Sequence, residues 1–350
     1  MASPNLDART PPSQRSHDYP DAPVLATVWR GGHVESVHRG AWCLVDSSGT
    51  IVEEHGPVRH AFFTRSSVKC LQVLPLLETG AADRVSLTEE ELALAVSSHN
   101  AEPAHVAVAR GLLRRLDLTE DDLGCGRQPP GDPAARAELF ESGAEPGRIH
   151  NNCSGKHAGF LALTRHVGGE VADYLDPESP SQVLVREAVS DLCDVAPADL
   201  GVAIDGCSAP TFRMSLKALG TAFARVTTPD GLAPERRTAC ERVLAAVCAH
   251  PVLLAGRVKR LDTAIVRATG GALFPKIGAE AIYAVGVPGR DLARAVKVDD
   301  GGLRGLHAIV VGLLRRLGLL DEAASRALES FGQRTLRNWD GIEVGRIDLE

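Results

Sequence analysis

Alternating apolar and polar positions near the start of the chain predict antiparallel strands. Residues 22–30, 34–46 and 50–55 show this alternation, and a Ser-Ser-Gly turn at residues 47–49 separates the last two. Side chains of a strand point to opposite faces in turn, so this pattern is typical of a sheet with one face on the core. The first 60 residues therefore predict the beginning of an antiparallel sheet.

The pattern then changes to apolar residues spaced three or four apart, which predicts helices. We expect a first helix with Ser66 as its N-cap and Gly80 at its end. A second helix follows Thr88, another candidate cap, and residues 103–250 are predicted to be mainly helical.

After about residue 257 the pattern returns to short apolar segments separated by glycines. These segments predict further antiparallel strands at residues 264–269, 272–278, 281–287 and 293–298. A strongly apolar helix is expected over residues 303–320.

These elements together predict an α/β (α+β) fold, in which an antiparallel sheet built from both ends of the chain is flanked by helices. We expect a sheet lobe over residues 22–65 and 257–350, and a mainly helical lobe inserted at residues 66–256. Residues 22–350 would form a single catalytic unit. Residues 1–21 are polar and rich in proline, and we expect a disordered leader there.

Composition excludes several classes of partner. The formal net charge is −7 without a basic stripe, which argues against nucleic acid. The longest apolar stretch, residues 306–314, is too short to span a membrane. Eight scattered cysteines do not resemble a disulfide scaffold, so we expect a reduced, cytoplasmic protein in which some cysteines could bind metal.

Lysine is rare in this chain, with six residues against a large excess of arginine. Ser66 and Lys69 form an S-x-x-K motif, whose members share one side of a helix. A neutral lysine at that position could accept the serine proton, whereas an arginine could not. Taken alone, the motif fits a capping serine followed by a surface lysine better.

Two further motifs follow in the order known from serine β-lactamases and penicillin-binding proteins. Ser98 begins an S-x-N motif at a helix end, and Lys276 lies two residues before a glycine on a predicted strand. Three weak motifs in the correct order favour the serine β-lactamase-like fold. Ile277 lacks the hydroxyl that β-lactamases use to hold a carboxylate, and no convincing omega-loop glutamate is present, so penicillin is disfavoured.

Cys153, Lys156 and Cys207 are a possible metal site. Zinc favours cysteine and histidine, whereas lysine is a rare ligand. On spacing alone, two buried cysteines beside a glycine turn are the better interpretation.

Several segments together resemble the asparaginase II family, the rhizobial type of L-asparaginase. The resemblance spans roughly residues 23 to 340, and NNCSGKH and DGCSAP are its most specific segments. The others are RSSVKCLQVLPLLETGAAD, LALAVSSHNAEPAH, RLDTAIV, FPKIGAEAIYAVGV and KVDDGGLRG.

This resemblance implies an amidohydrolase with Ser66 as nucleophile, Lys69 as its base, and a second pair made of Ser98 and Lys276. It also implies a homodimer, and a zinc ion that orients the substrate. The zinc ligands implied are Cys153, Lys156 and Cys207.

The expected reaction is hydrolysis of L-asparagine through an acyl-enzyme on Ser66. Asp205 could bind the substrate ammonium and Arg65 its carboxylate. The alternatives are a related serine hydrolase, such as a glutaminase, esterase or β-lactamase, or a zinc-containing binding protein without catalytic activity.

Overall fold

The computed structural model describes residues 19–332 and 334–350. The predicted leader therefore lies outside the described residues except for residues 19–21. No helix in the described ranges is long and apolar enough to cross a membrane.

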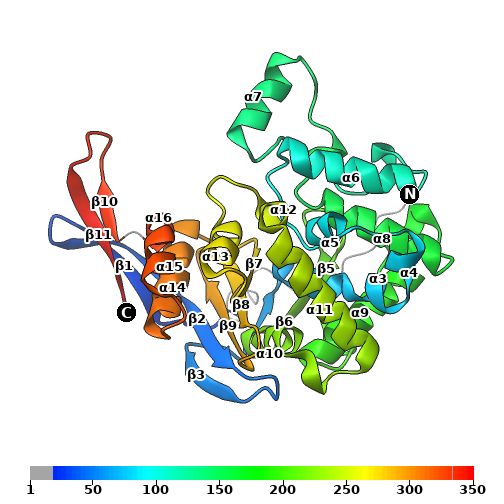
Figure 1. Ribbon diagram of the computed structural model, residues 1–350. Helices are drawn as coiled ribbons and strands as arrows, with labels where there is room; N and C mark the ends of the chain where they lie inside the picture. Colours follow the sequence, from blue (N-terminus) through cyan, green and yellow to red (C-terminus); the bar gives the residue numbers. More distant parts are fainter. Residues whose placement is uncertain (1–18, 333) are drawn as a thin grey trace, which may run out of the picture.

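A single antiparallel sheet joins the two ends of the chain (Figure 1). Its strand order is β10-β11-β1-β2-β9-β8-β7, with β3 paired to β2, and every pairing is antiparallel. The N-terminal strands are β1 (Val24–Arg30), β2 (His33–Val45) and β3 (Ile51–His55). The C-terminal strands are β7 (Phe274–Gly278), β8 (Ile282–Val287), β9 (Leu292–Val298), β10 (Thr335–Arg337) and β11 (Glu343–Leu349). The predicted class, a mixed α/β fold around an antiparallel sheet, is confirmed.

Both faces of the central strands are buried, which gives the sheet two hydrophobic cores. On one face, Cys43 of β2 belongs to a core that includes helix α10 (Leu216–Thr227). On the other face, its neighbour Trp42 belongs to a core that includes α14 (Leu303–Arg316). This alternation is the period of two that a strand requires, and it holds the sheet between two layers of helices.

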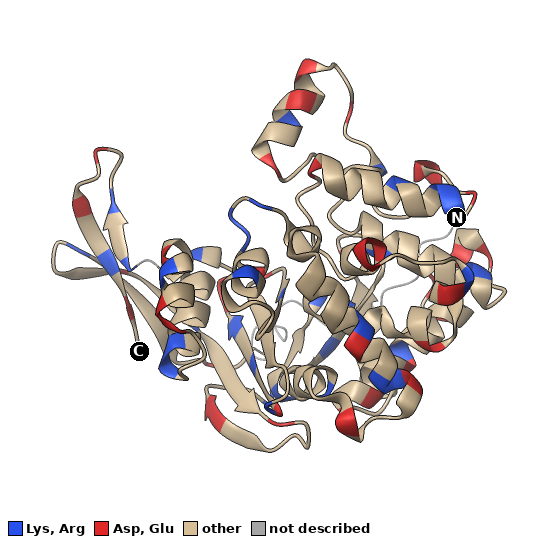
Figure 2. Cartoon of the chain, viewed as in Figure 1, with Lys and Arg blue, Asp and Glu red and all other residues tan. Residues whose placement is uncertain are grey.

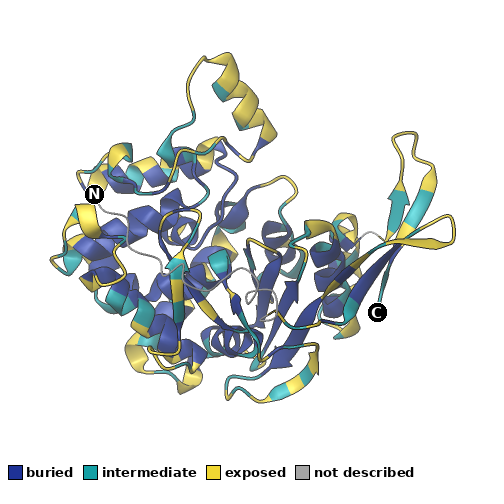
Figure 3. Cartoon of the chain, turned by 180° about the vertical axis from the view of Figure 1, so that it is seen from behind, coloured by how far each residue is buried: buried dark blue, intermediate teal, exposed yellow. Residues whose placement is uncertain are grey.

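Most helices lie in one lobe beside the sheet (Figure 1). Its longer helices are α6 (Pro103–Arg115), α7 (Pro133–Glu141), α8 (Ser154–His166), α9 (Pro180–Cys193) and α11 (Pro234–Ala249). Figure 3 shows that α7 projects from this lobe and is mostly exposed, whereas the other four line the buried interior. A small second sheet, of order β4-β6-β5, consists of β4 (Ala61–Phe63), β6 (Pro210–Ser215) and β5 (Gly201–Ile204).

Several local predictions are confirmed by the structure. Thr88 caps α5 (Glu89–Ala95) with a reciprocal capping box to Glu91. Gly80 has a φ of +79°, as expected where a helix ends.

Other local predictions are wrong. Residues 264–269, expected to be a strand, belong to helix α13 (Leu261–Thr269). The continuous helix expected from Ser66 to Gly80 is instead a 3-10 turn η1 (Arg65–Val68) followed by α2 (Lys69–Gln72) and α3 (Leu74–Glu78), with Pro75 at the start of α3.

Candidate active site

Ser66 lies in a sharp turn between the small sheet and the first helices. The residue before it, Arg65, has a φ of +49°, a left-handed conformation that is uncommon and strained for a residue other than glycine. The expected N-cap role of Ser66 is wrong: η1 begins at Arg65, the cap position is Thr64, and the Thr64 hydroxyl donates to Phe212 O at 3.0 Å. The left-handed residue starts the turn one position earlier than the apolar pattern indicates.

This turn directs Ser66 and Lys69 to the same side of the chain. Residues three apart eclipse each other in a 3-10 helix, and η1 begins at Arg65 and leads directly into Lys69. The Ser66 side chain is partly exposed and lines a cavity, whereas Lys69 is 1% exposed. Within the described residues, the Ser66 hydroxyl has no hydrogen bond, so it is free to meet a ligand in the cavity.

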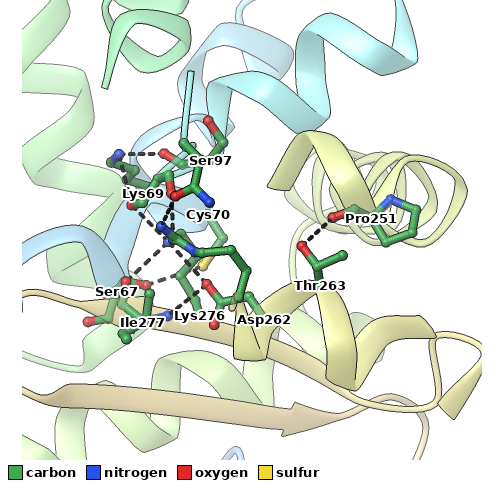
Figure 4. Close-up of polar contacts among 12 residues, drawn as sticks. Ser67, Lys69, Cys70, Ser97, Pro251, Asp262, Thr263, Lys276 and Ile277 are labelled. Carbon is green, nitrogen blue, oxygen red and sulfur yellow. Dashed lines mark hydrogen bonds and ion pairs between the residues drawn. The ribbon is translucent and has the colours of Figure 1, made fainter. Parts of the chain in front are cut away.

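The Ser98 hydroxyl bridges the two lysines that the motifs single out. Figure 4 labels both lysines, with Ser97 and Ile277 close to them. Lys69 Nζ and Lys276 Nζ each lie 3.1 Å from Ser98 Oγ. Lys69 also donates to the carbonyl of Ser97, and Lys276 to that of Ile277 at 3.1 Å. The structure thus brings together three side chains, from α2, the loop after α5, and β7.

Two buried ammonium groups on one hydroxyl repel each other, which favours loss of one proton. Lys276 is fully buried, and burial lowers its pKa to about 7. Asp262 opposes this shift, whereas the charges of Lys69 and Arg260 add to it. A lysine that is substantially neutral near pH 7 can serve as a general base.

Sequence reasoning missed two residues that hold this arrangement, the buried Asp262 and the half-buried Arg260. Asp262 of α13 is 1% exposed, and its Oδ2 lies 3.4 Å from Ile277 N and 3.9 Å from Lys276 Nζ. Arg260 donates to Ser98 O and, at 2.8 Å, to Asn100 Oδ1, so it fixes the loop that carries Ser98. The segment RLDTAIV contained both residues, but nothing in their spacing indicated contact with the lysines.

The cavity beside these groups has a volume of about 290 Å³. Its wall includes Ser66, Ser98, Asn152, Asp262 and Gly278. That volume is at the lower end of the range of about 300–1,000 Å³ that is usual for ligand pockets, which suits a small substrate.

Gly278 allows η1 to lie against the end of β7. A Cβ at this position would lie 2.6 Å from Thr64 O and 3.2 Å from Ser67 N. The glycine of the third motif therefore permits the close backbone approach that brings Ser66 to the strand carrying Lys276.

Arg65 and Asp205, expected to bind the two charged ends of a substrate, bind each other in this structure. Arg65 Nε lies 2.6 Å from Asp205 Oδ1, which also accepts from Gly206 N at 2.7 Å. Arg65 lines a separate cavity along the small sheet. Their proposed contacts with substrate stay predictions.

Cys153, Lys156 and Cys207 lie together and are all buried. Lys156 Nζ lies 3.3 Å from Cys207 Sγ. Hydrogen bonding from Cys153 lowers the pKa of Cys207 strongly and raises that of Cys153. The Cys153 thiol also contacts Asn152 Oδ1 at 3.2 Å, and Asn152 lines the cavity, so this cluster borders the substrate space.

This cluster fits zinc by its donor chemistry. A thiolate beside a second thiol provides the soft donors that zinc prefers. Among the described residues, no group of three or more His, Cys, Asp or Glu side chains could hold a metal, so Lys156 would have to supply the third donor. The adjacent His157 forms a side-chain hydrogen bond with Cys207, which favours the thiolate form of that cysteine.

Comparison with solved structures gives only distant likenesses. Mglu in its native form is 15% identical with a TM-score of 0.44, and the match covers 81% of this chain and 66% of Mglu, just under two thirds. A β-lactamase from Mycobacterium bovis is 15% identical with a TM-score of 0.40, and the match covers 84% of this chain and 95% of the β-lactamase. A Bacillus glutaminase is 12% identical with a TM-score of 0.35, and the match covers 80% of this chain and 91% of the glutaminase. Because these scores are below 0.5, we base no argument about function on them.

Comparison with curated proteins finds no match. The profile of the family described as L-asparaginase II, by contrast, matches residues 26–349, which include all the site residues described above. The chain therefore belongs to the L-asparaginase II family.

Proposed function

We propose that this protein is an L-asparaginase, which hydrolyses L-asparagine to L-aspartate and ammonia. Family membership supports an asparaginase-like amidohydrolase acting on a small amide. The observation that carries the proposal is the Ser98 hydroxyl, held 3.1 Å from both buried lysines in the wall of the cavity that Ser66 lines.

In the first half of the proposed reaction, Ser66 Oγ attacks the side-chain amide carbon of asparagine. Its proton passes to the relay formed by Lys69, Ser98 and Lys276. The pKa of Lys276 is about 7, so this lysine is substantially neutral near pH 7 and can accept a proton. Backbone N–H groups of Ser66 and the end of β7 stabilise the oxyanion. The relay then returns the proton to the leaving nitrogen, and the C–N bond breaks to release ammonia.

In the second half, water attacks the β-aspartyl ester on Ser66. The same lysine and serine relay takes a proton from the water and returns one to Ser66 Oγ as the ester bond breaks. The products are aspartate and the free enzyme. The cytoplasmic location and homodimeric state implied earlier stay predictions.

Ammonia release from purified protein tests the substrate. We expect L-asparagine to be turned over with a kcat/KM at least about tenfold above that for L-glutamine, because one methylene in a fitted pocket is worth about 1–3 kcal/mol. Equal or faster release from glutamine would indicate the glutaminase alternative. Release from neither amide, with esters also inert, would favour the binding protein.

We further propose that Cys153, Lys156 and Cys207 hold a zinc ion. When bound, zinc would add positive charge beside the cavity and help to orient the substrate. Asn152 links the cluster to the cavity wall. Its Oδ1 accepts a hydrogen bond from the Cys153 thiol, and the residue itself lines the cavity.

Replacing Cys207 with serine should remove this metal. We expect about one zinc ion per wild-type chain by elemental analysis and almost none in Cys207→Ser, because a neutral hydroxyl is a far weaker zinc ligand than a thiolate. The melting temperature of the variant should also stop responding to added zinc. Cys248→Ser is the matched control, since Cys248 is the exposed cysteine and lies elsewhere. Equal zinc content in both variants would contradict the assignment.

A further inference from the structure

A larger cavity, of about 840 Å³, lies next to the catalytic one. The two share Lys259, Arg260, Leu303 and His307 in their walls, so they are contiguous. Helix α13 forms one side, and α14 with the segment containing Ser330 and Phe331 forms the other.

The wall of this cavity is strongly basic. It contains Arg257, Lys259, Arg260 and Arg267, and none of its lining residues is acidic. In Figure 2 the loop that precedes α13 is blue, and this loop carries three of the four cationic residues. A chain with a net charge of −7 thus concentrates positive charge beside its candidate active site.

Two of these four cations have no acidic partner within the described residues. Arg257 is paired with Glu102 at 2.6 Å. Arg260 donates to the oxygens of Ser98 and Asn100, and the negative charges of Asp262 and Glu102 also act on it. Lys259 and Arg267 are exposed, and neither forms an ion pair or hydrogen bond with any residue that the structure describes.

The arrangement on α13 directs these groups into one space. Arg260, Thr263 and Arg267 follow one another at spacings of three and four, which places them on one face of the helix. All three line the cavity, whereas Leu261, Ile265 and Val266 of the same helix are buried in the cores. The exposed Ser330 adds a hydroxyl donor to this lining, whereas the Thr263 hydroxyl already donates to Pro251 O at 3.0 Å.

The proposed substrate does not explain this charge. L-Asparagine is a zwitterion with no net charge near pH 7, so a cationic cavity beside the site gives it little net attraction. We infer that the cavity formed by Arg257, Lys259, Arg260 and Arg267 is a binding site for a small anion with two or more negative charges, of the dicarboxylate or phosphate type. This inference goes beyond the proposed function and does not depend on it.

Calorimetric titration of the full chain with inorganic phosphate and with succinate, at low ionic strength, tests the site. We expect saturable binding with a Kd below about 1 mM for at least one of them. Tighter binding of phosphate would identify a phosphoryl group as the natural ligand, and tighter binding of succinate a dicarboxylate.

Variants locate the binding. Arg267→Gln and Lys259→Gln should each weaken it roughly five- to tenfold, because each removes a charge-assisted donor. Arg114→Gln is the matched control, since Arg114 is an exposed arginine near the end of α6 and lies outside this cavity. Arg260 is left intact because it holds Ser98.

The Ser66→Ala protein should bind the anion as the wild type does, which separates this test from the catalytic one. The inference is overturned if neither anion binds up to about 10 mM, or if Arg267→Gln and Lys259→Gln bind as tightly as Arg114→Gln.

Discussion

Replacing Ser66 with alanine should lower kcat for ammonia release from L-asparagine by at least about 10⁴-fold. The variant has no oxygen to form the acyl-enzyme, and removal of a catalytic nucleophile costs several orders of magnitude in comparable enzymes. The Ser66 side chain lines the cavity and makes no hydrogen bond within the described residues, so its loss should leave the fold intact. Steady-state ammonia release at saturating asparagine measures the effect.

The neighbouring serine provides the control. Ser67 is fully buried, and its hydroxyl donates to Thr64 O at 2.7 Å, so Ser67→Ala should cost about 1 kcal/mol of stability but change kcat only a few fold. A Ser66→Ala enzyme that kept more than about a tenth of the wild-type kcat would exclude a nucleophilic role.

The second large effect should come from Lys276, and it should depend on pH. Because its pKa is lowered to about 7, the neutral, proton-accepting form increases as the pH rises through that value. We therefore expect kcat/KM to rise with pH through about 7 and then to level off. Lys276→Arg should lose roughly 10²- to 10⁴-fold in kcat, because arginine stays protonated.

Lys217→Arg is the matched control for that change, since Lys217 lies on α10 and outside the catalytic cavity. It should retain both the wild-type rate and the rising limb. A Lys276→Arg enzyme with an unchanged pH profile would rule out Lys276 as the group that titrates.

The strands of the main sheet could be predicted well where their pattern is strong. The alternation in residues 34–46 and the glycine-bounded runs 272–278 and 281–287 correspond to β2, β7 and β8. Residues 264–269 are equally short and apolar, yet they form part of α13. A short apolar run with β-branched residues is compatible both with a strand and with the buried face of a helix. Packing against the rest of the protein, rather than the local pattern, makes residues 264–269 helical.

The lysine and serine motifs could be found because they are local. Ser66 and Lys69 lie three residues apart, and the order of the three motifs along the chain is itself a signal. Asp262 and Arg260 could not be found in that way. Their importance comes from packing of α13 against β7 and the Ser98 loop, which no pattern along the chain records.

The prediction that Ser66 is a helix N-cap is wrong for a similar reason. A serine before an apolar run usually caps a helix, but the left-handed Arg65 and its ion pair with Asp205, which lies 140 residues further along the chain, begin the turn earlier. A long-range contact thus overrides a local preference at the position where the chemistry is expected.

The bridge between Lys276 and Ser98 joins residues 178 positions apart, and this has a consequence for folding kinetics. Contacts of such high sequence separation form late, because the entropy of closing the intervening chain is lost before the contact gives any stability in return. The helical lobe can begin to form locally, but the proton relay exists only once β7 has docked beside η1. Regain of activity during refolding should therefore report the last long-range step of assembly rather than the formation of helices.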